Sequence, residues 1–144
     1  MMALIPAVIA WFLAQFIKCF IDLVTHRETS VIRALFGSGG MPSSHSSTIC
    51  AITTYIVLTE GITSPVADLS IIVAFIVMYD AMNVRRETGR QGKYLNDLEE
   101  FLTSLGKKFE PMEFKELVGH TPLQVVCGML LGIVVGFAYF KLMG

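Results

Sequence analysis

The sequence predicts an all-α fold: a polytopic membrane helix bundle of about four transmembrane helices, with an additional amphipathic helix in the segment 85–120. Two observations lead to this prediction. The 144 residues are 53% hydrophobic and only 16% charged, whereas a soluble domain carries about 25% charged residues. The apolar residues also gather in long stretches almost free of charge, and a helix needs about 20 such residues to cross a bilayer. A chain of this length is expected to form one domain, residues 1–144.

Three stretches are long and apolar enough to span the membrane. They cover residues 1–24, 66–84 and 121–140. A fourth stretch, 45–59, is uncharged but shorter and richer in Ser and Thr, so its polar start is expected to face a cavity rather than lipid. The first stretch lacks the basic start of a signal peptide and is interpreted as a retained helix.

The segment between the second and the last span is expected to contain the amphipathic helix. Over 92–105, apolar residues recur at helical spacing: Leu95, Leu98, Phe101, Leu102 and Leu105. A helix of this kind either lies at the membrane surface or docks on the protein. The sequence leaves both positions open.

The charges predict how the bundle is oriented. Alternating spans place the segments 25–44 and 85–120 on one side of the membrane. Of the 11 Lys and Arg residues, Lys141 alone falls on the other side, so the positive-inside rule assigns the basic side to the cytoplasm. The net charge of −1 argues against nucleic acid as a partner, because chains that bind it are usually strongly basic. Membrane lipids are the expected surroundings.

Two histidine motifs lie on the basic side, each at the start of a predicted helix. The first, Gly-Gly-Met-Pro-Ser-Ser-His over 39–45, presents backbone N–H groups and hydroxyls that suit an anion. Its alternative interpretation is a loop that ends in an ordinary Ser N-cap. The second, Gly-His-Thr-Pro-Leu-Gln-Val over 119–125, has Thr121 as a good N-cap and Pro122 at the first helical position. Two such motifs on one side favour a phosphate site.

These motifs resemble those of a known superfamily. Pro-Ser-Ser-His at 42–45 is similar to the P-S-G-H motif of the type 2 phosphatidic acid phosphatase superfamily, which includes the vanadium haloperoxidases. The segment 119–128 resembles the second half of its third motif, G-x-H-x-x-x-D-V-x-x-G. The residues of these motifs are most similar to those of a small divergent branch of the superfamily. The resemblance covers about residues 18–132. It implies hydrolysis of a lipid or prenyl phosphate through a phosphohistidine, with no metal ion or other cofactor.

The resemblance also implies a role for each matching residue. His120 would be the nucleophile and His45 the general acid. Phosphate binding would fall to Lys18, Gly40, Ser43, Ser44, Arg85 and Arg86, of which Arg85 matches the arginine of a split third motif and Arg86 is its near equal. The first motif lacks its usual Arg-Pro, and Arg27 or Arg33 is expected to serve instead.

Gln124 is the main departure from the family pattern. It stands where the family has a carboxylate, so it can orient the ring of His120 but supplies no charge. Asp80 is the candidate to replace that carboxylate; its alternative is an ion pair with Arg85 or Arg86, because an ionisable group near the end of a span implies a partner. Gln124 therefore leaves two functions open: a phosphatase, or a non-catalytic membrane protein that binds anionic lipid headgroups in a degenerate pocket.

Lys18 is a cation inside a predicted span and has three interpretations. Its side chain extends to the interface, or it pairs with Asp22 four residues on, or it binds phosphate. It lies about 9 Å along the helix from Val24, which keeps it within reach of the basic side. We favour phosphate binding.

The last span carries a repeated small-residue pattern. Gly128, Gly132 and Gly136 place glycine at every fourth position, which is typical of close helix packing. The partner is either the helix at 45–59 or a second copy in a homodimer.

Overall fold

The computed structural model describes residues 2–25, 40–106 and 120–143, and all their regular structure is helical. In chain order the elements are α1 (Leu4–Val24), α3 (Ser44–Glu60), α4 (Pro65–Tyr79), the π-helical turn η1 (Asp80–Val84), α5 (Arg85–Ser104) and α6 (Pro122–Met143). The predicted all-α fold is confirmed.

Three helical stretches in the described parts are long and apolar enough to cross a bilayer: Leu4–Val24, Pro65–Ser104 and Pro122–Met143. The 17 residues of α3 reach about 26 Å at 1.5 Å per residue, a little less than a hydrocarbon core of about 30 Å. The helix predicted over 45–59 therefore exists, and it spans Ser44–Glu60.

The helix starts are set by local chemistry. Ser43, Ser64 and Thr121 precede α3, α4 and α6, and the side-chain oxygen of each accepts a hydrogen bond from the backbone N–H three residues on, at 3.4, 3.1 and 3.4 Å. Pro65 and Pro122 occupy the first helical positions, where the missing N–H is not needed. These caps explain why the three helices begin where they do.

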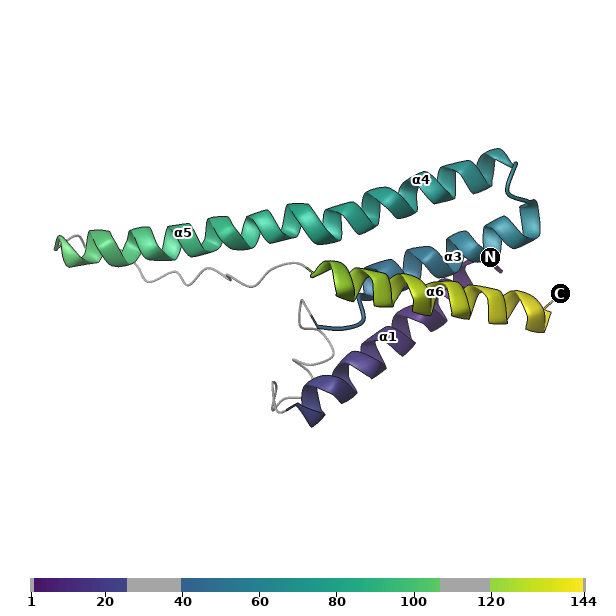
Figure 1. Ribbon diagram of the computed structural model, residues 1–144, viewed down its shortest axis with the longest axis horizontal. Coiled ribbons are helices and arrows are strands. Elements are labelled where there is room, and N and C mark those ends of the chain that lie inside the picture. Colours follow the sequence, from purple (N-terminus) through teal and green to yellow (C-terminus); the bar gives the residue numbers. More distant parts are fainter. Residues whose placement is uncertain (1, 26–39, 107–119, 144) are drawn as a thin grey trace.

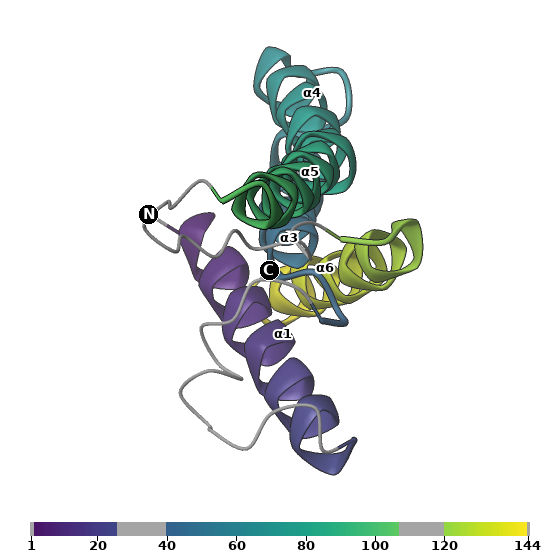
Figure 2. The ribbon, with the colours of Figure 1, turned by 90° about the vertical axis from the view of Figure 1, so that its left-hand side faces the viewer.

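Helix α3 lies in the middle of the bundle, with α1, α4 and α6 around it (Figures 1 and 2). The core is built from small side chains, in which Ala10 of α1 and Ala51 of α3 pack with Val135 of α6. Small residues let helix backbones approach closely in a membrane protein. Two hydroxyls add bonds between helices: Ser47 Oγ donates to the α1 carbonyl of residue 10 at 3.4 Å, and Thr53 Oγ1 donates to the α4 carbonyl of residue 70 at 3.2 Å.

The glycines of α6 form the closest packing surface in the bundle. A Cβ added to Gly128, Gly132 or Gly136 would strike a main-chain oxygen of α3, at Ser43, Ser47 and Ala51 in turn. Glycine is required at these positions because any side chain would push the two helices apart. The partner of this face in the structure is therefore α3 of the same chain, and the homodimer stays a prediction.

Helices α4 and α5 form one continuous rod through η1, and α5 extends beyond the bundle (Figure 1). The sequence predicted a separate amphipathic helix near 92–105, whereas the helix already begins at Arg85. No proline interrupts residues 66–104, so nothing ends the helix.

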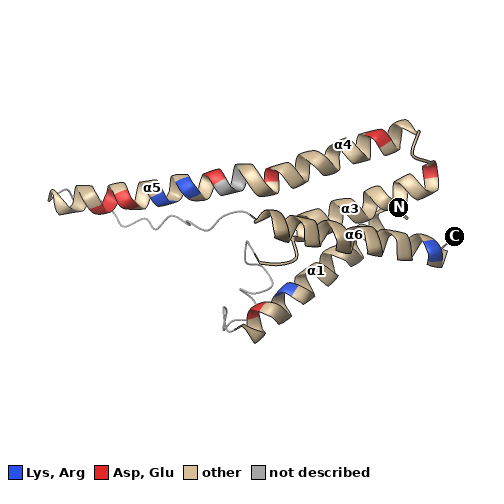
Figure 3. Cartoon of the chain, viewed as in Figure 1, with Lys and Arg blue, Asp and Glu red and all other residues tan. Residues whose placement is uncertain are grey.

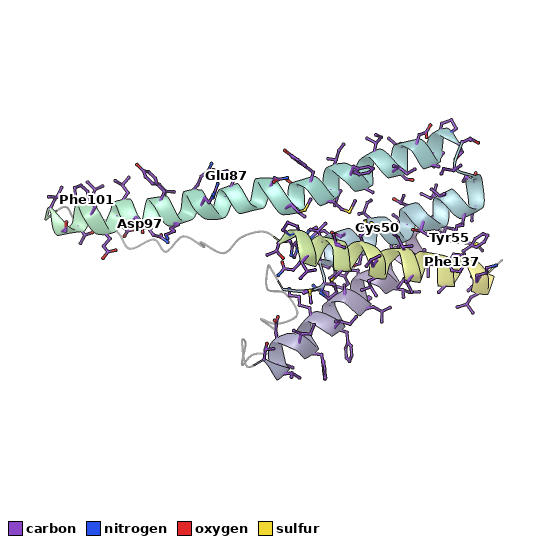
Figure 4. All side chains as sticks on the ribbon, viewed as in Figure 1. Cys50, Tyr55, Glu87, Asp97, Phe101 and Phe137 are labelled. Atoms are coloured by element: carbon purple, nitrogen blue, oxygen red, sulfur yellow. The ribbon has the colours of Figure 1, made fainter. Side chains whose placement is uncertain are left out.

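Charged residues are dense on α5 and sparse elsewhere (Figure 3). Asp97 and Phe101 both lie on the part outside the bundle, whereas Cys50, Tyr55 and Phe137 lie within it (Figure 4).

The two ends of the bundle differ in what they hold. Both chain termini and the turn between α3 and α4 lie at one end (Figure 1). The starts of α3 and α6 lie at the other end, together with η1. This arrangement agrees with the alternating topology predicted from the spans, and it gathers the two histidine motifs at one end.

Candidate active site

His45 and His120 approach each other where α3 and α6 begin. His45 lies in the first turn of α3, and His120 directly precedes the N-cap of α6. Their ring centroids are 6.1 Å apart and the ring planes are inclined at 60°. His120 is only 8% exposed, whereas the side chain of His45 is exposed. Two histidines that are 75 positions apart in the sequence thus share one small volume.

A backbone hydrogen bond holds the two helix starts together. The N–H of Ser43 donates to the carbonyl oxygen of Gln124 at 3.0 Å. Each helix start carries the positive end of a helix dipole and N–H groups without intrahelical acceptors. Because both starts meet here, the site suits an anion such as a phosphate group.

The turn η1 is the third element of the site. The N–H of His120 donates to the carbonyl oxygen of Ala81, at 3.0 Å, and Ala81 is 2% exposed. A π-helical turn bonds each carbonyl one residue further along than an α-helix does, and such turns are frequent at functional sites. This bond joins the α4–α5 rod to the start of α6. No residue type in the sequence signals it, so sequence reasoning missed it.

Gln124 orients the ring of His120. Its Oε1 accepts a hydrogen bond from the N–H of Thr121 at 3.0 Å and lies 3.2 Å from Nδ1 of His120. A backbone N–H only donates, so the side-chain atom of Gln124 at this position is the amide oxygen. Nδ1 must then carry the hydrogen and donate to Oε1. A neutral His120 in this tautomer has its lone pair on Nε2, which is the form a nucleophile needs.

Ser43 and Ser44 have different surroundings. The side chain of Ser43 is fully buried, and its Oγ accepts from the backbone N–H and from the hydroxyl of Ser46, at 3.4 and 3.1 Å. Its structural role is therefore the N-cap, which was the alternative interpretation of this motif. Ser44 is half-buried at the first position of α3, beside His45.

Lys18 lies inside the bundle against the first described residue of the loop before α3. Only 6% of Lys18 is exposed. Its Cγ and Cε are each 3.0 Å from the point that a Cβ on Gly40 would occupy, and Gly40 has a φ of +83°. The side chain of Lys18 is therefore covered by the rest of the protein. The absence of a side chain at Gly40 leaves the space that Lys18 fills.

Three other predicted site residues lie in η1 and directly after it. Asp80 is half-buried and opens η1, next to the residue that accepts the bond from His120. Arg85 and Arg86 begin α5 directly after η1. Arg27 and Arg33 lie outside the described residues. Within 2–25, 40–106 and 120–143, no group of three His, Cys, Asp or Glu residues is arranged to hold a metal ion.

The fold and this site define an integral membrane protein with paired histidines at two converging helix starts. Comparison with known families gives the same class. The model of the divergent PAP2 family matches residues 1–135, and the chain belongs to this family. It is 34% identical over 149 aligned positions to the uncharacterized membrane protein YuiD of Bacillus subtilis (strain 168), and the match covers 95% of this chain and 94% of YuiD. No solved structure matches the chain.

Proposed function

We propose that this protein is a metal-independent, membrane-embedded phosphatase that hydrolyses a lipid or prenyl phosphate through a phosphohistidine, at the cytoplasmic surface of the membrane. The observation that supports it most is the approach of His45 and His120, with ring centroids 6.1 Å apart at two helix starts. Reacting atoms stand about 3–3.5 Å apart before attack, and proton-transfer partners about 2.6–3.2 Å. A phosphate group between the rings can therefore contact both.

In the first step, Nε2 of His120 attacks phosphorus. The bond between phosphorus and the lipid oxygen breaks as the P–N bond forms, and His45 donates a proton to the leaving oxygen. In the second step, a water molecule attacks the phosphohistidine while His45 takes its proton. The P–N bond breaks, and inorganic phosphate and the starting His120 are released. The bond from Nδ1 to Gln124 keeps the attacking nitrogen in the required form.

The charge that develops on the transferring phosphoryl group needs stabilisation. The N-termini of α3 and α6 supply oriented dipoles, and Lys18 supplies a positive charge beside the loop at Gly40. An amphiphilic substrate fits such a site at the end of a bundle, because its head reaches the polar end while its tail remains among lipids. The outer face of α1 presents Phe12, Phe16 and Phe20, all more than 60% exposed, as expected of lipid-facing residues.

The test is phosphate release in reconstituted vesicles. Purified protein is incubated with phosphatidate, phosphatidylglycerophosphate and prenyl pyrophosphates in turn. We expect release from at least one, its loss in His120→Ala, and a trapped phosphohistidine in His45→Ala. His26→Ala serves as the matched control, because the third histidine has no assigned role. A parent that releases phosphate from none of these substrates, with Gln124→Glu equally inactive, contradicts the proposal.

A second candidate function is favoured by Gln124 itself. Without a carboxylate, the positive charge that forms on His120 during attack is less well stabilised. The alternative is a non-catalytic protein that binds anionic lipid headgroups at the same helix starts. Headgroup binding that survives His120→Ala, in a protein without turnover, supports this alternative.

A further inference from the structure

Lys18 and Asp22 are two buried charged residues, four positions apart, in a part of α1 where charge is costly. They are 6% and 9% exposed, and both belong to a stretch long and apolar enough to span a bilayer. Ionisable residues in such segments usually face the interior of the bundle and mark a functional site. Asp22 has no role in the mechanism described so far.

The pair lies on the face of α1 that packs into the bundle. The buried side of this helix begins with Ala7, Ala10 and Ala14 and continues with Lys18 and Asp22. The spacing of three or four residues keeps all five on one side of the helix. Both charges are therefore directed toward the other helices rather than toward lipid.

Helix stability does not explain Asp22. It lies in the last turn of α1, where the negative end of the helix dipole disfavours a carboxylate. It also follows Lys18 by four residues, and this order of charges is the less favourable one on a helix. A different interaction must account for an acidic residue at this position.

The surroundings of Lys18 indicate that interaction. The Asp22 carboxylate follows Lys18 by one helical turn on the same buried side of α1. The carbon chain of Lys18 lies along Gly40, three residues before the N-cap of the helix that carries His45. Asp22 is one turn further along α1, about 6 Å along the axis, so its carboxylate attracts the ammonium toward the end of the helix and away from the apolar centre.

We propose that Asp22 is a positioning residue for phosphate binding: it holds the ammonium group of Lys18 beside Gly40, where that group binds the phosphate of the substrate. The inference rests on the proposed function, because it assigns Asp22 to the same site. Asp22 acts through Lys18 and does not itself touch the substrate.

The experiment combines binding with kinetics in the full-length protein. Inorganic phosphate is titrated against the melting temperature of the parent and of Asp22→Asn, Asp22→Glu, Lys18→Met and the double variant Lys18→Met/Asp22→Asn. KM and kcat are measured for the same proteins with the best lipid substrate. Asp68→Asn is the control, because Asp68 is an exposed carboxylate in the first turn of α4.

We expect Asp22→Asn to weaken phosphate binding and to raise KM by about tenfold, the size expected when a charge-assisted hydrogen bond to an anion is weakened, with a smaller change in kcat. Asp22→Glu should restore both, and Asp22→Asn should add nothing in the Lys18→Met background, because Asp22 acts through Lys18. Asp68→Asn should match the parent.

Two results overturn the inference. One is phosphate binding and KM at parental values in Asp22→Asn. The other is a purely structural effect, in which Asp22→Asn lowers the melting temperature and Lys18→Met restores it together with parental phosphate binding. Failure of the proposed function is recognised separately, since the parent then binds phosphate but hydrolyses no substrate. A parent that does not bind phosphate overturns both.

Discussion

Gly128 of α6 lies directly against the main-chain carbonyl of Ser43, the N-cap residue of α3. One turn earlier in α6, the carbonyl of Gln124 accepts the N–H of that same Ser43. The contacts that pack the two helices together at Ser43 therefore also hold the site together. A change at Gly128 should affect both, whereas a change further along the glycine face should affect packing alone.

This relationship predicts a difference between Gly128→Ala and Gly136→Ala. Each added methyl group would meet the α3 backbone, so each should destabilise the protein by about 1–3 kcal/mol, as overpacking does. Gly128→Ala should also displace the start of α3 and lower the rate of phosphate release, whereas Gly136→Ala acts at the far end of the bundle. Thermal unfolding in detergent and turnover at a permissive temperature measure the two effects. Equal losses of turnover in two equally stable variants would argue against the link.

Gln124 provides a second prediction. Gln124→Leu removes the acceptor for Nδ1 of His120, so the ring loses its fixed tautomer and kcat should fall by about 10–100-fold, the equivalent of a hydrogen bond of about 1.5–3 kcal/mol to a charged group. Gln124→Glu keeps the acceptor and adds a negative charge that stabilises the imidazolium form, so kcat should be equal to or above that of the parent. Steady-state phosphate release measures both. Parental turnover in Gln124→Leu contradicts this role.

Gly40 and Gly61 allow a matched test of the loop at Lys18. Both have positive φ, +83° and +84°, but a Cβ at Gly40 meets the Lys18 side chain and a Cβ at Gly61 meets nothing within 4 Å. Alanine at either position should cost about 1–3 kcal/mol of backbone strain. Gly40→Ala should in addition displace Lys18 and raise KM, which Gly61→Ala should leave unchanged. A parental KM in Gly40→Ala would separate Lys18 from phosphate binding.

The orientation in the membrane is tested with two single cysteines. Thr63 and Thr103 are exposed at opposite ends of the structure, in the turn between α3 and α4 and on α5. After replacement of Cys19, Cys50 and Cys127 by alanine, we expect a membrane-impermeant thiol reagent added to intact cells to label Thr63→Cys and not Thr103→Cys. Labelling of Thr103→Cys alone reverses the orientation and moves the site to the outer surface.

The sequence predicted those features that depend on neighbouring residues. The cap at Thr121 and the proline at position 122 act within one helical turn, and the structure confirms both. The cap at Ser43, which the sequence offered as an alternative interpretation, is also local. The glycine spacing of α6 predicted close packing but not its partner, because spacing is a property of one helix and the partner depends on the whole bundle. The hydrogen bond from His120 to Ala81 could not be predicted, because it joins two backbone groups and does not depend on the side chains of the two residues.

The continuity of the α4–α5 rod also escaped prediction. The apolar pattern over 92–105 located the helix correctly, but hydrophobic spacing does not show whether a helix is separate from the one before it. The residues between the two patterns are polar and charged, including Arg85 and Glu87, and a polar stretch is compatible with both a loop and a helix outside the membrane. The helix continues because nothing in this stretch breaks it.

The turn η1 determines the direction in which the side chains of α5 point relative to those of α4. In an uninterrupted α-helix, Ile76 and Tyr94 would lie on one line, because 18 residues make about five turns. The extra residue in a π-turn rotates α5 by about 100°, which is the rotation per residue of an α-helix. The exposed apolar sides of α4 and α5 therefore point in different directions. Adding or removing one residue after Val84 would turn α5 about its own axis and leave the two histidines where they are.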